Sequence, residues 1–244
     1  RGPSEREIEL ARDIQTTFLP DAIPALEGWR VAIEWRAARG VGGDYYDFIP
    51  LEEGRWGFII ADVSDKGVGA ALYMALSRAV VRAAALDARG PAETLERANR
   101  VLVGDNRSGM FVSLFYAVLD PCSGTLCYAR AGHNPPLWLR AERGEMQPLC
   151  PPGVVLGITE DAGIGEETVV LAPRDAVVMY TDGVIDAVDD ANREFGEERL
   201  GALLQTRVGE PAESLVGEID RAVRRFVGGR EQFDDFTLLV LSRE

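Results

Sequence analysis

The sequence predicts an α+β fold in which antiparallel β-sheets are covered by helices. Strand-like segments come first, a pair of helices follows, strands return, and two further helices precede a closing strand. This grouping favours antiparallel sheets, because a parallel doubly wound sheet needs stricter alternation of strand and helix. The chain has 244 residues, 46% of them hydrophobic and 27% charged, so it can bury a sizeable core.

The first half of the chain carries the clearest periodic patterns. Apolar residues from Ile8 to Phe18 recur at helical spacing until Pro20, and alternation in the following segments is typical of strands. An Ala-rich segment and a segment that starts at Pro91 predict two helices. The expected elements are a helix, three strands and two helices: residues 4–19, 29–35, 45–49, 56–63, 69–88 and 91–103.

The second half returns to strand-like patterns. Turn chemistry at DPCSGT and at HNPP divides residues 111–139 into several strands. Helical and alternating patterns then define the remaining elements. These are strands 166–171 and 176–180, helices 197–204 and 213–227, and strand 236–241.

Charge and composition exclude several classes of protein. A formal charge of −14 disfavours a nucleic-acid binder, which needs clustered cations. The most apolar stretch contains Arg78 and Arg82, so no membrane-spanning segment is expected. Three cysteines without CxxC spacing and the single His133 exclude a zinc site and favour a reducing cytoplasm. The chain opens on Arg rather than Met, so we expect it to be part of a longer polypeptide.

Two aspartates are expected to face each other across a hairpin. Asp44 starts a strand in GVGGDYYDF, and Asp62 ends the buried run GFIIAD. In a hairpin that turns at Glu52 and Glu53, paired residues have numbers that sum to about 106, which sets 44 opposite 62. Like charges in this position are destabilising unless something neutralises them.

The same arrangement recurs near the end of the chain. Asp182 ends the strand AVVMYTDG, and Asp234 and Asp235 open the strand FTLLVL. Each aspartate alone is more readily explained as a turn residue. If the strands pair, however, the acidic side chains meet at one sheet edge, where hard oxygen ligands suit Mg²⁺ or Mn²⁺. Neighbouring glycines, such as Gly42 and Gly183, permit close approach to an ion or a phosphate.

An ordered series of motifs resembles one known family. The segments GVGGDYYDF, IIADVSDKGVGAAL, MFVSLFYAVLD, YARAGHNPPL, VVMYTDGVIDA, FGEERL and FDDFTLLVL occur in this order. The series is similar to that of the bacterial SpoIIE/RsbU-type serine phosphatases, a branch of the metal-dependent PPM (type 2C) protein phosphatases. The resemblance implies an αββα sandwich of two antiparallel sheets flanked by helices. It also divides the chain into a linker helix, residues 1–20, and a phosphatase domain, residues 21–244.

The resemblance also implies a site with two Mn²⁺ or Mg²⁺ ions. Asp44 would bind one ion, often through water, and Asp62 would bridge both, with the Val63 carbonyl as a further ligand. Asp182 and Asp234 would hold the other ion. Asp235 stands where relatives carry Asn or Asp, and we rank it below Asp234. Catalysis through these aspartates would use metal-activated water to hydrolyse a phosphomonoester.

Some expected catalytic groups are missing from the sequence. The eukaryotic enzymes carry a His after the bridging Asp, whereas Val63, Ser64, Asp65 and Lys66 follow here, so the general acid has no candidate. His133 is expected to make structural hydrogen bonds, and Lys66 is either a phosphate-orienting residue or a solvated loop cation. No protein nucleophile is evident, since Ser64 and Ser113 lack a nearby base in the sequence. The resemblance further makes residues 68–104 a candidate regulatory switch.

The expected function is that of a protein serine/threonine phosphatase in the cytoplasm. By resemblance, its substrate is a phosphorylated STAS-domain antagonist of an anti-sigma factor in a partner-switching pathway. An upstream sensor domain is expected in the longer chain, and residues 4–19 resemble a linker that can mediate homodimer formation. The alternative is a pseudophosphatase that binds a partner without chemistry. A GGDEF-type nucleotide cyclase is disfavoured, because Tyr45 and Tyr46 follow Gly42-Gly43-Asp44.

Overall fold

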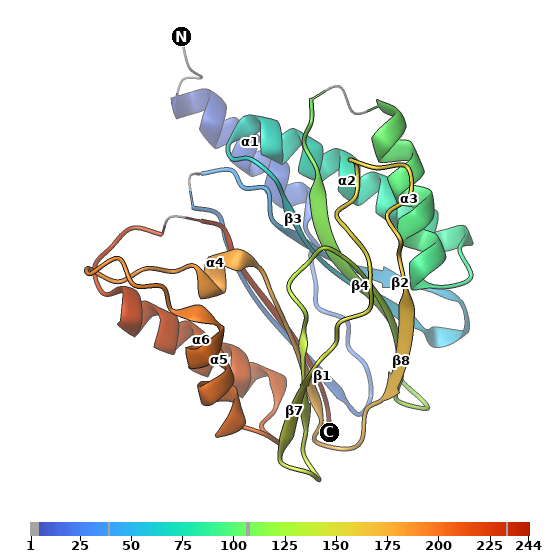
Figure 1. Ribbon diagram of the computed structural model, residues 1–244, viewed down its shortest axis with the longest axis vertical. Helices are drawn as coiled ribbons and strands as arrows, with labels where there is room; N and C mark the ends of the chain where they lie inside the picture. The colour runs from blue at the N-terminus through green and yellow to red at the C-terminus, as the bar shows by residue number, and fades with distance from the viewer. Residues whose placement is uncertain (1–4, 39, 106–107, 233) are drawn as a thin grey trace.

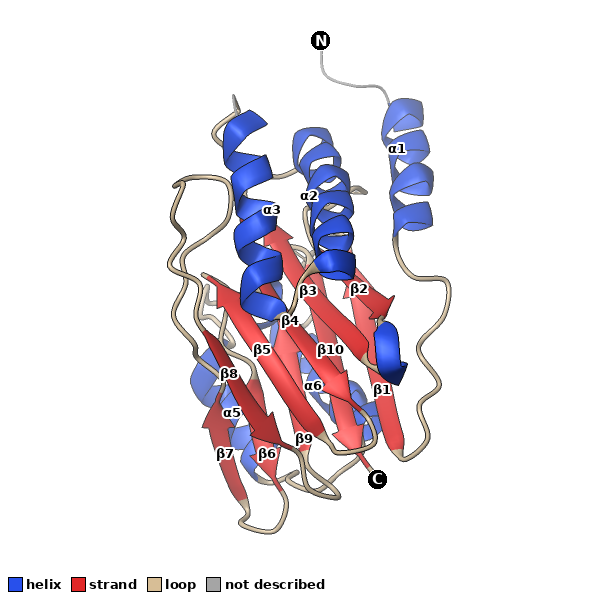
Figure 2. Cartoon of the chain, turned by 90° about the vertical axis from the view of Figure 1, so that its right-hand side faces the viewer, coloured by secondary structure: helices blue, strands red, loops and turns tan. Residues whose placement is uncertain are grey.

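The computed structural model describes residues 5–38, 40–105, 108–232 and 234–244. Two five-stranded antiparallel sheets pack face to face, with helices against both outer faces (Figures 1 and 2). The expected αββα sandwich is therefore confirmed. The helices are α1 (Glu5–Phe18), α2 (Val68–Asp87), α3 (Pro91–Asp105), α4 (Asp182–Ile185), α5 (Gly196–Gln205) and α6 (Ala212–Val227), with a 3₁₀ turn at Glu52–Gly54.

The two sheets draw on different parts of the chain. One sheet has the order β1-β10-β9-β6-β7 and the other the order β2-β3-β4-β5-β8. The strands of the first sheet are β1 (Trp29–Arg36), β6 (Leu137–Arg140), β7 (Glu145–Pro148), β9 (Ala176–Tyr180) and β10 (Phe236–Arg243). Those of the second are β2 (Tyr45–Pro50), β3 (Trp56–Val63), β4 (Val112–Asp120), β5 (Thr125–Ala131) and β8 (Glu166–Val170).

The register of two strand pairs agrees with the sequence prediction. In the β2–β3 hairpin Tyr45 pairs with Ala61 and Ile49 with Gly57, so each pair sums to 106. Strands β9 and β10 are antiparallel neighbours, with Tyr180 opposite Leu238. The hairpin turns at the 3₁₀ segment because Glu53 takes a left-handed conformation there. Both pairings direct the aspartates at the strand ends toward the same end of the molecule.

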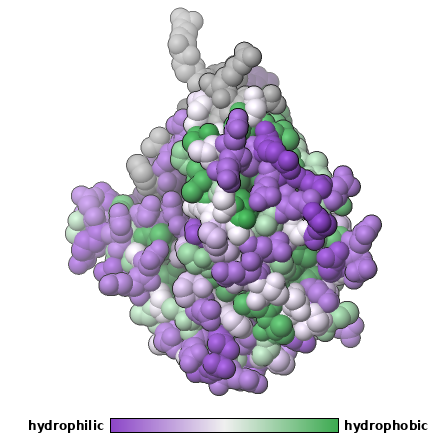
Figure 3. Space-filling model, turned by 45° about the vertical axis from the view of Figure 1, so that its right-hand side comes forward, coloured by the Kyte–Doolittle hydropathy of each residue, from purple (hydrophilic) through white to green (hydrophobic). Residues whose placement is uncertain are grey.

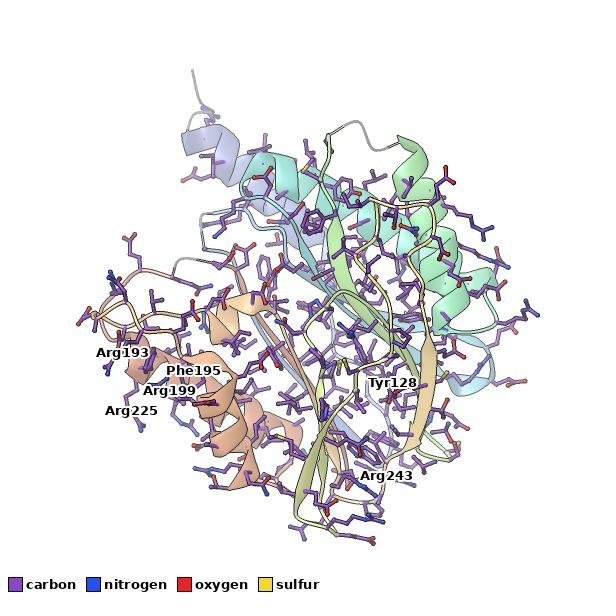
Figure 4. All side chains as sticks on the ribbon, viewed as in Figure 1. Tyr128, Arg193, Phe195, Arg199, Arg225 and Arg243 are labelled. Carbon is purple, nitrogen blue, oxygen red and sulfur yellow. The ribbon has the colours of Figure 1, made fainter. Side chains whose placement is uncertain are left out.

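Three apolar layers hold the sandwich together. Aromatic residues such as Phe48, Phe58 and Phe115 fill the space between the sheets. A second layer lies between the β2–β8 sheet and helices α2 and α3, and a third between the β1–β7 sheet and helices α4 to α6. Figure 4 shows Phe195 and Arg199 on the α5–α6 side of the molecule, where both rest against the ring of Phe226. Hydrophilic side chains cover most of the face in Figure 3, with smaller hydrophobic areas between them.

Helix α2 lies on the β2–β8 sheet beside α3. In the described part of the chain it is the one helix whose length and composition would suffice to cross a membrane, a test that core helices also pass. Its arginines have a structural role here. Arg82 donates two hydrogen bonds of 2.8 Å to the buried carboxylate of Asp47 on β2, and Arg78 pairs with the same carboxylate at 3.3 Å. These ion pairs attach α2 to the sheet.

Helix α1 contacts the loop that leads into β2. The Arg12 guanidinium donates to the Gly40 carbonyl at 2.9 Å. The buried Gln15 amide bonds the backbone of Gly42 in both directions, accepting from its N–H at 3.0 Å and donating to its carbonyl. The helix expected over residues 4–19 is therefore confirmed, while the division into a linker and a domain stays a prediction.

Two elements are absent from the sequence prediction. Strand β7 is short and largely exposed, so its residues lack the alternation that marks a half-buried strand. Helix α4 has a single turn and starts at Asp182, too short for a periodic pattern. The second omission matters for the site, since α4 carries one of its aspartates.

Candidate metal centre

The four highest-ranked aspartates come together at one end of the two sheets. Asp44 immediately precedes β2, and Asp62 lies near the end of β3, where the hairpin register continues. Asp44 and Asp62 affect each other's pKa, and the charges of Asp182 and Asp234 act on Asp62. The four carboxyl groups therefore lie close together, and their roles as metal ligands stay predictions.

Asp44 is the most deeply buried member of the cluster, with 2% of its surface exposed. The hydroxyl groups of Thr181 and Thr237 each donate a hydrogen bond of 2.6 Å to its Oδ2. These bonds favour the charged carboxylate, but burial and the charges of Asp62 and Asp235 dominate and hold its pKa well above the usual range. Asp44 is thus held in one orientation, in surroundings that disfavour its charged form.

Asp62, like Asp44, is largely buried beside other carboxyl groups. Burial, followed by the charges of Asp182 and Asp234, raises its pKa to about 7. A carboxyl group with this pKa keeps a proton near neutral pH unless a cation replaces it. A divalent ion bound here would take the place of that proton.

Asp182 is oriented by the loop that follows β5. The side-chain amide of Asn134 donates to Asp182 Oδ1 at 2.7 Å. The adjacent His133 is buried, and its Nε2 donates to the Tyr180 carbonyl at 3.0 Å. Burial lowers the pKa of His133 to about 4, so the ring is neutral at pH 7. His133 thus joins the two sheets just before Asp182, which confirms its hydrogen-bonding role.

The fold brings a ring nitrogen to Ser113, which has no base near it in the sequence. Its hydroxyl lies 2.9 Å from Nδ1 of His133, twenty positions further along the chain. The contact arises from tertiary structure, since β4 and β5 are neighbouring strands. Because Nε2 carries the proton donated to Tyr180, Nδ1 accepts from Ser113. With its low pKa and both nitrogens engaged, His133 is a poor general base for Ser113.

Asp234 and Asp235 have different surroundings. Asp234 Oδ2 forms an ion pair of 3.1 Å with Lys66. Asp235 instead accepts backbone hydrogen bonds from Ala38 at 2.8 Å and from Gly43 at 2.7 Å. Asp235 therefore fixes the loop that carries Asp44, and its part in metal binding stays a prediction ranked below that of Asp234.

Glycines permit the close approach of these segments. A Cβ atom at Gly42 would lie 2.3 Å from the carboxylate of Asp235, and one at Gly183 would lie 1.8 Å from the Asp235 carbonyl. At Gly43 a Cβ atom would lie 2.8 Å from the carbonyl oxygen of Val63, the predicted backbone ligand. Larger residues at these positions would force the aspartate-bearing segments apart.

The chemistry of the site fits a hard divalent cation. Its donors are carboxylate and carbonyl oxygens, the ligands that Mg²⁺ and Mn²⁺ prefer. Across the described residues, however, no three Asp, Glu, His or Cys side chains are spaced as a complete ligand set. Protein donors occupy the carboxylates instead, so the side chains must adjust to bind an ion.

Four residues of the site escaped the sequence analysis. Thr181 and Thr237 hold Asp44, Asn134 holds Asp182, and Asp186 adds a further carboxylate. Burial and the charge of Asp182 raise the pKa of Asp186. Thr181, Thr237 and Asp186 lie within four residues of a predicted site residue, so proximity in the sequence was the available signal for these three. Asn134 is 48 positions from Asp182 and has no such signal.

The chain matches the sequence model of a known protein family. The sequence model of the family described as stage II sporulation protein E (SpoIIE) matches residues 52–244. The chain belongs to the SpoIIE family. Among curated relatives of this SpoIIE-family chain, protein IcfG of Synechocystis sp. is 29% identical over 269 residues, and phosphoserine phosphatase RsbU of Bacillus subtilis is 29% identical over 238 residues. The alignments cover 99% and 98% of the chain but 42% and 70% of these relatives.

Solved structures support the same fold. The SiaA-PP2C domain of Pseudomonas aeruginosa superposes with a TM-score of 0.86 at 23% identity, covering 98% of the SpoIIE-family chain and 96% of that domain. The RsbU and RsbW domains of Rv1364c from Mycobacterium tuberculosis match with a TM-score of 0.80 at 26% identity, covering 93% of the chain and 63% of that structure. A structure of RsbX in complex with magnesium matches with a TM-score of 0.65 at 14% identity, covering 91% and 99%. The fold is therefore PP2C-like.

Proposed function

We propose that the chain is a metal-dependent phosphoserine phosphatase. The observation that carries the proposal is the convergence of Asp44, Asp62, Asp182 and Asp234 at one end of the sheets. Burial and the charges of neighbouring carboxylates raise the pKa of Asp62 to about 7, a perturbation of the kind that functional sites show. Membership of the SpoIIE family and similarity to the phosphoserine phosphatase RsbU support the same activity.

The cofactor we propose is a pair of Mn²⁺ or Mg²⁺ ions. Asp44, Asp62, Asp182 and Asp234 would hold them, with the Val63 carbonyl and Asp235 as further candidates. Such ions supply an activated water molecule and neutralise the phosphoryl oxygens. The magnesium complex of RsbX, which shares the fold, supports a hard divalent cation.

The chain's own residues prepare the site for this chemistry. Thr181 and Thr237 fix Asp44, and Asn134 fixes Asp182, so these carboxylates keep their orientation before substrate arrives. His133 couples the strand that precedes Asp182 to β4. Neither Ser113 nor His133 is required as a nucleophile in this scheme.

A cleft of about 430 Å³ beside the acidic cluster offers room for the substrate. Asp186 and Asp234 lie at its wall, Val223 and Phe236 contribute apolar surface, and Arg230 adds a cationic group. The volume is within the range of small-molecule and side-chain binding sites. We propose that the polypeptide around the phosphoserine lies in this cleft.

The proposed substrate is a phosphorylated STAS-domain antagonist of an anti-sigma factor. The motif resemblance and the similarity to RsbU support a partner-switching role. The chain spans 42% and 70% of the length of the curated relatives IcfG and RsbU, and the upstream sensor domain is proposed from the motif resemblance. All three cysteines are free thiols, in keeping with the proposed cytoplasmic location.

The test is phosphate release from a phosphoserine-bearing STAS protein and from p-nitrophenyl phosphate, with and without Mn²⁺. We expect Asp62→Asn and Asp182→Asn to lower Mn²⁺-dependent kcat/KM by roughly 100-fold or more, because each removes a charged ligand. Asp21→Asn, which changes an exposed loop carboxylate, serves as the matched control. Full activity in EDTA, or in the Asp62 and Asp182 variants, would contradict the metal mechanism.

A pseudophosphatase is the second candidate function. The observation that favours it is the engagement of Asp44, Asp182 and Asp234 by protein donors, without a preformed ligand set among the described residues. It predicts binding of the phosphorylated STAS protein without phosphate release at any Mn²⁺ concentration. Turnover that depends on Mn²⁺ would exclude it.

A further inference from the structure

Lys66 is unusual in both its identity and its position. The sequence contains 26 Lys and Arg residues, and Lys66 is the only lysine among them. It lies four residues after Asp62, in the loop between β3 and α2. The single lysine of the chain thus stands beside the acidic cluster.

The ammonium group of Lys66 contacts one carboxylate of this cluster and lies near enough to a second, Asp186, for its charge to act there. Its Nζ lies 3.1 Å from Asp234 Oδ2. The charge of Lys66 also acts on Asp186, where it opposes the raised pKa caused by burial and by Asp182. Lys66 therefore supplies positive charge to the part of the site predicted to bind an ion.

A lysine side chain can leave a carboxylate more readily than an arginine side chain can. Its ammonium is a compact, strongly hydrated point charge on a flexible stem, whereas arginine binds a carboxylate through a rigid, bidentate fork. At the buried carboxylate of Asp47 the chain uses arginine, and Nη1 of Arg82 donates to both of its oxygens. The side chains of Lys66 and Asp234 are 35% and 36% exposed, so their ion pair is weakened by solvent and readily exchanged.

We propose that Lys66 is a tethered stand-in cation, which binds Asp234 in the metal-free protein and withdraws when a divalent ion occupies the site. This inference rests on the proposed metal-dependent function. Lys66 keeps the Asp234 carboxylate partly neutralised without an ion. Because the ion pair between Lys66 and Asp234 must break before the ion binds, it lowers the apparent affinity of the site for the metal.

The first test uses Lys66 as a site-specific probe. Reductive methylation with ¹³C-formaldehyde labels one lysine side chain, whose NMR signal is distinct from that of the terminal amine and is absent in Lys66→Arg. We expect Asp234→Asn to shift this signal in EDTA, which tests the contact without any metal. We also expect Mg²⁺ to shift the wild-type signal in step with binding measured by calorimetry.

The second test measures Mg²⁺ and Mn²⁺ affinity by calorimetry. Removal of the competing charge in Lys66→Gln should tighten binding by up to about fivefold, the equivalent of one exposed ion pair. Lys66→Arg should bind no more tightly than wild type. Arg193→Gln, which removes an exposed charge paired with Asp189, is the matched control and should leave the affinity unchanged.

The outcomes separate this inference from the proposed function. An unmoved lysine signal in Asp234→Asn, or a signal unaffected by Mg²⁺ that calorimetry shows to bind, overturns the role of Lys66 and leaves the metal site intact. Equal tightening by Lys66→Gln and Arg193→Gln overturns it as well, because general electrostatics would then suffice. Absence of binding in both wild type and Lys66→Gln overturns the proposed metal site together with this inference.

Discussion

At the scale of single residues, neutral donors rather than cations orient most of the acidic cluster. Asn134 holds Asp182 through a hydrogen bond of 2.7 Å, and two threonines hold Asp44. A neutral donor fixes the direction of a carboxylate without cancelling its charge. At Asp62, a divalent cation therefore has to displace a proton rather than a salt-bridged side chain.

Substitution of Asn134 should weaken metal activation. Asn134→Ala frees Asp182 to rotate, and Asn134→Asp places a second negative charge against it. We expect about 10- to 100-fold more Mn²⁺ to be needed for half-maximal activity in Asn134→Ala, as for other residues that orient ligands. An Mn²⁺ titration of phosphatase activity measures this, with Asn192→Ala as the control. Equal titration curves for the two variants would contradict an orienting role for Asn134.

At the scale of elements, two helices act on the site from outside. Helix α1 binds the loop before β2 through Gln15 and Gly42, while Asp235 binds the same loop from the opposite end of the chain. This loop carries Asp44. Helix α2 follows Asp62 directly, and its arginines attach it to Asp47, three residues beyond Asp44. Both helices therefore contact the segments that carry Asp44, α1 through hydrogen bonds and α2 through ion pairs.

Loss of the Asp47 charge should detach α2 from the sheet. Asp47 is 1% exposed, so Asp47→Asn leaves the partly buried Arg78 without its carboxylate. Breaking a buried ion pair in this way costs roughly 3 kcal/mol of unfolding free energy, somewhat less here because Arg82 can turn toward solvent. Urea denaturation measures the loss, and hydrogen exchange should show it concentrated in α2. Glu93→Gln, which removes the ion pairs of Glu93 with Arg89 and Arg97 at the start of α3, should have a smaller effect; equal losses would contradict the prediction.

At the scale of the whole molecule, the sequence predicted arrangements that follow from local pattern and failed where tertiary contact decides. Periodicity and turn chemistry were enough for most helices and strands, and hairpin arithmetic placed Asp44 opposite Asp62. The partners of these aspartates could not be predicted in this way. Thr181 contacts Asp44 across 137 positions of sequence, and Ser113 meets His133 only because β4 lies beside β5.

The acidic cluster should also make the stability of the metal-free protein depend on pH. Asp62 has a folded pKa of about 7 against an ordinary value of 3.8, so the native state keeps a proton that the unfolded chain has released. This contribution to stability is complete below the lower pKa and is lost as pH rises through the higher one. His133 acts in the opposite sense. Its pKa falls from 6.5 to about 4, so its contribution is lost as pH falls through that interval.

Asp62→Asn separates the two groups, because the amide resembles a carboxyl that never loses its proton. In EDTA we expect the gain in unfolding free energy of Asp62→Asn over wild type to be about 2 kcal/mol larger at pH 8 than at pH 5.5. Since His133 is common to both proteins, its contribution cancels.

Mg²⁺ should then raise the Tm of wild type more at pH 8 than at pH 5.5, because a proton competes for Asp62 at the lower pH. It should raise the Tm of Asp62→Asn little at either pH. Urea denaturation and thermal melts at the two pH values measure these differences, and a gain that is independent of pH would show that Asp62 does not carry the raised pKa.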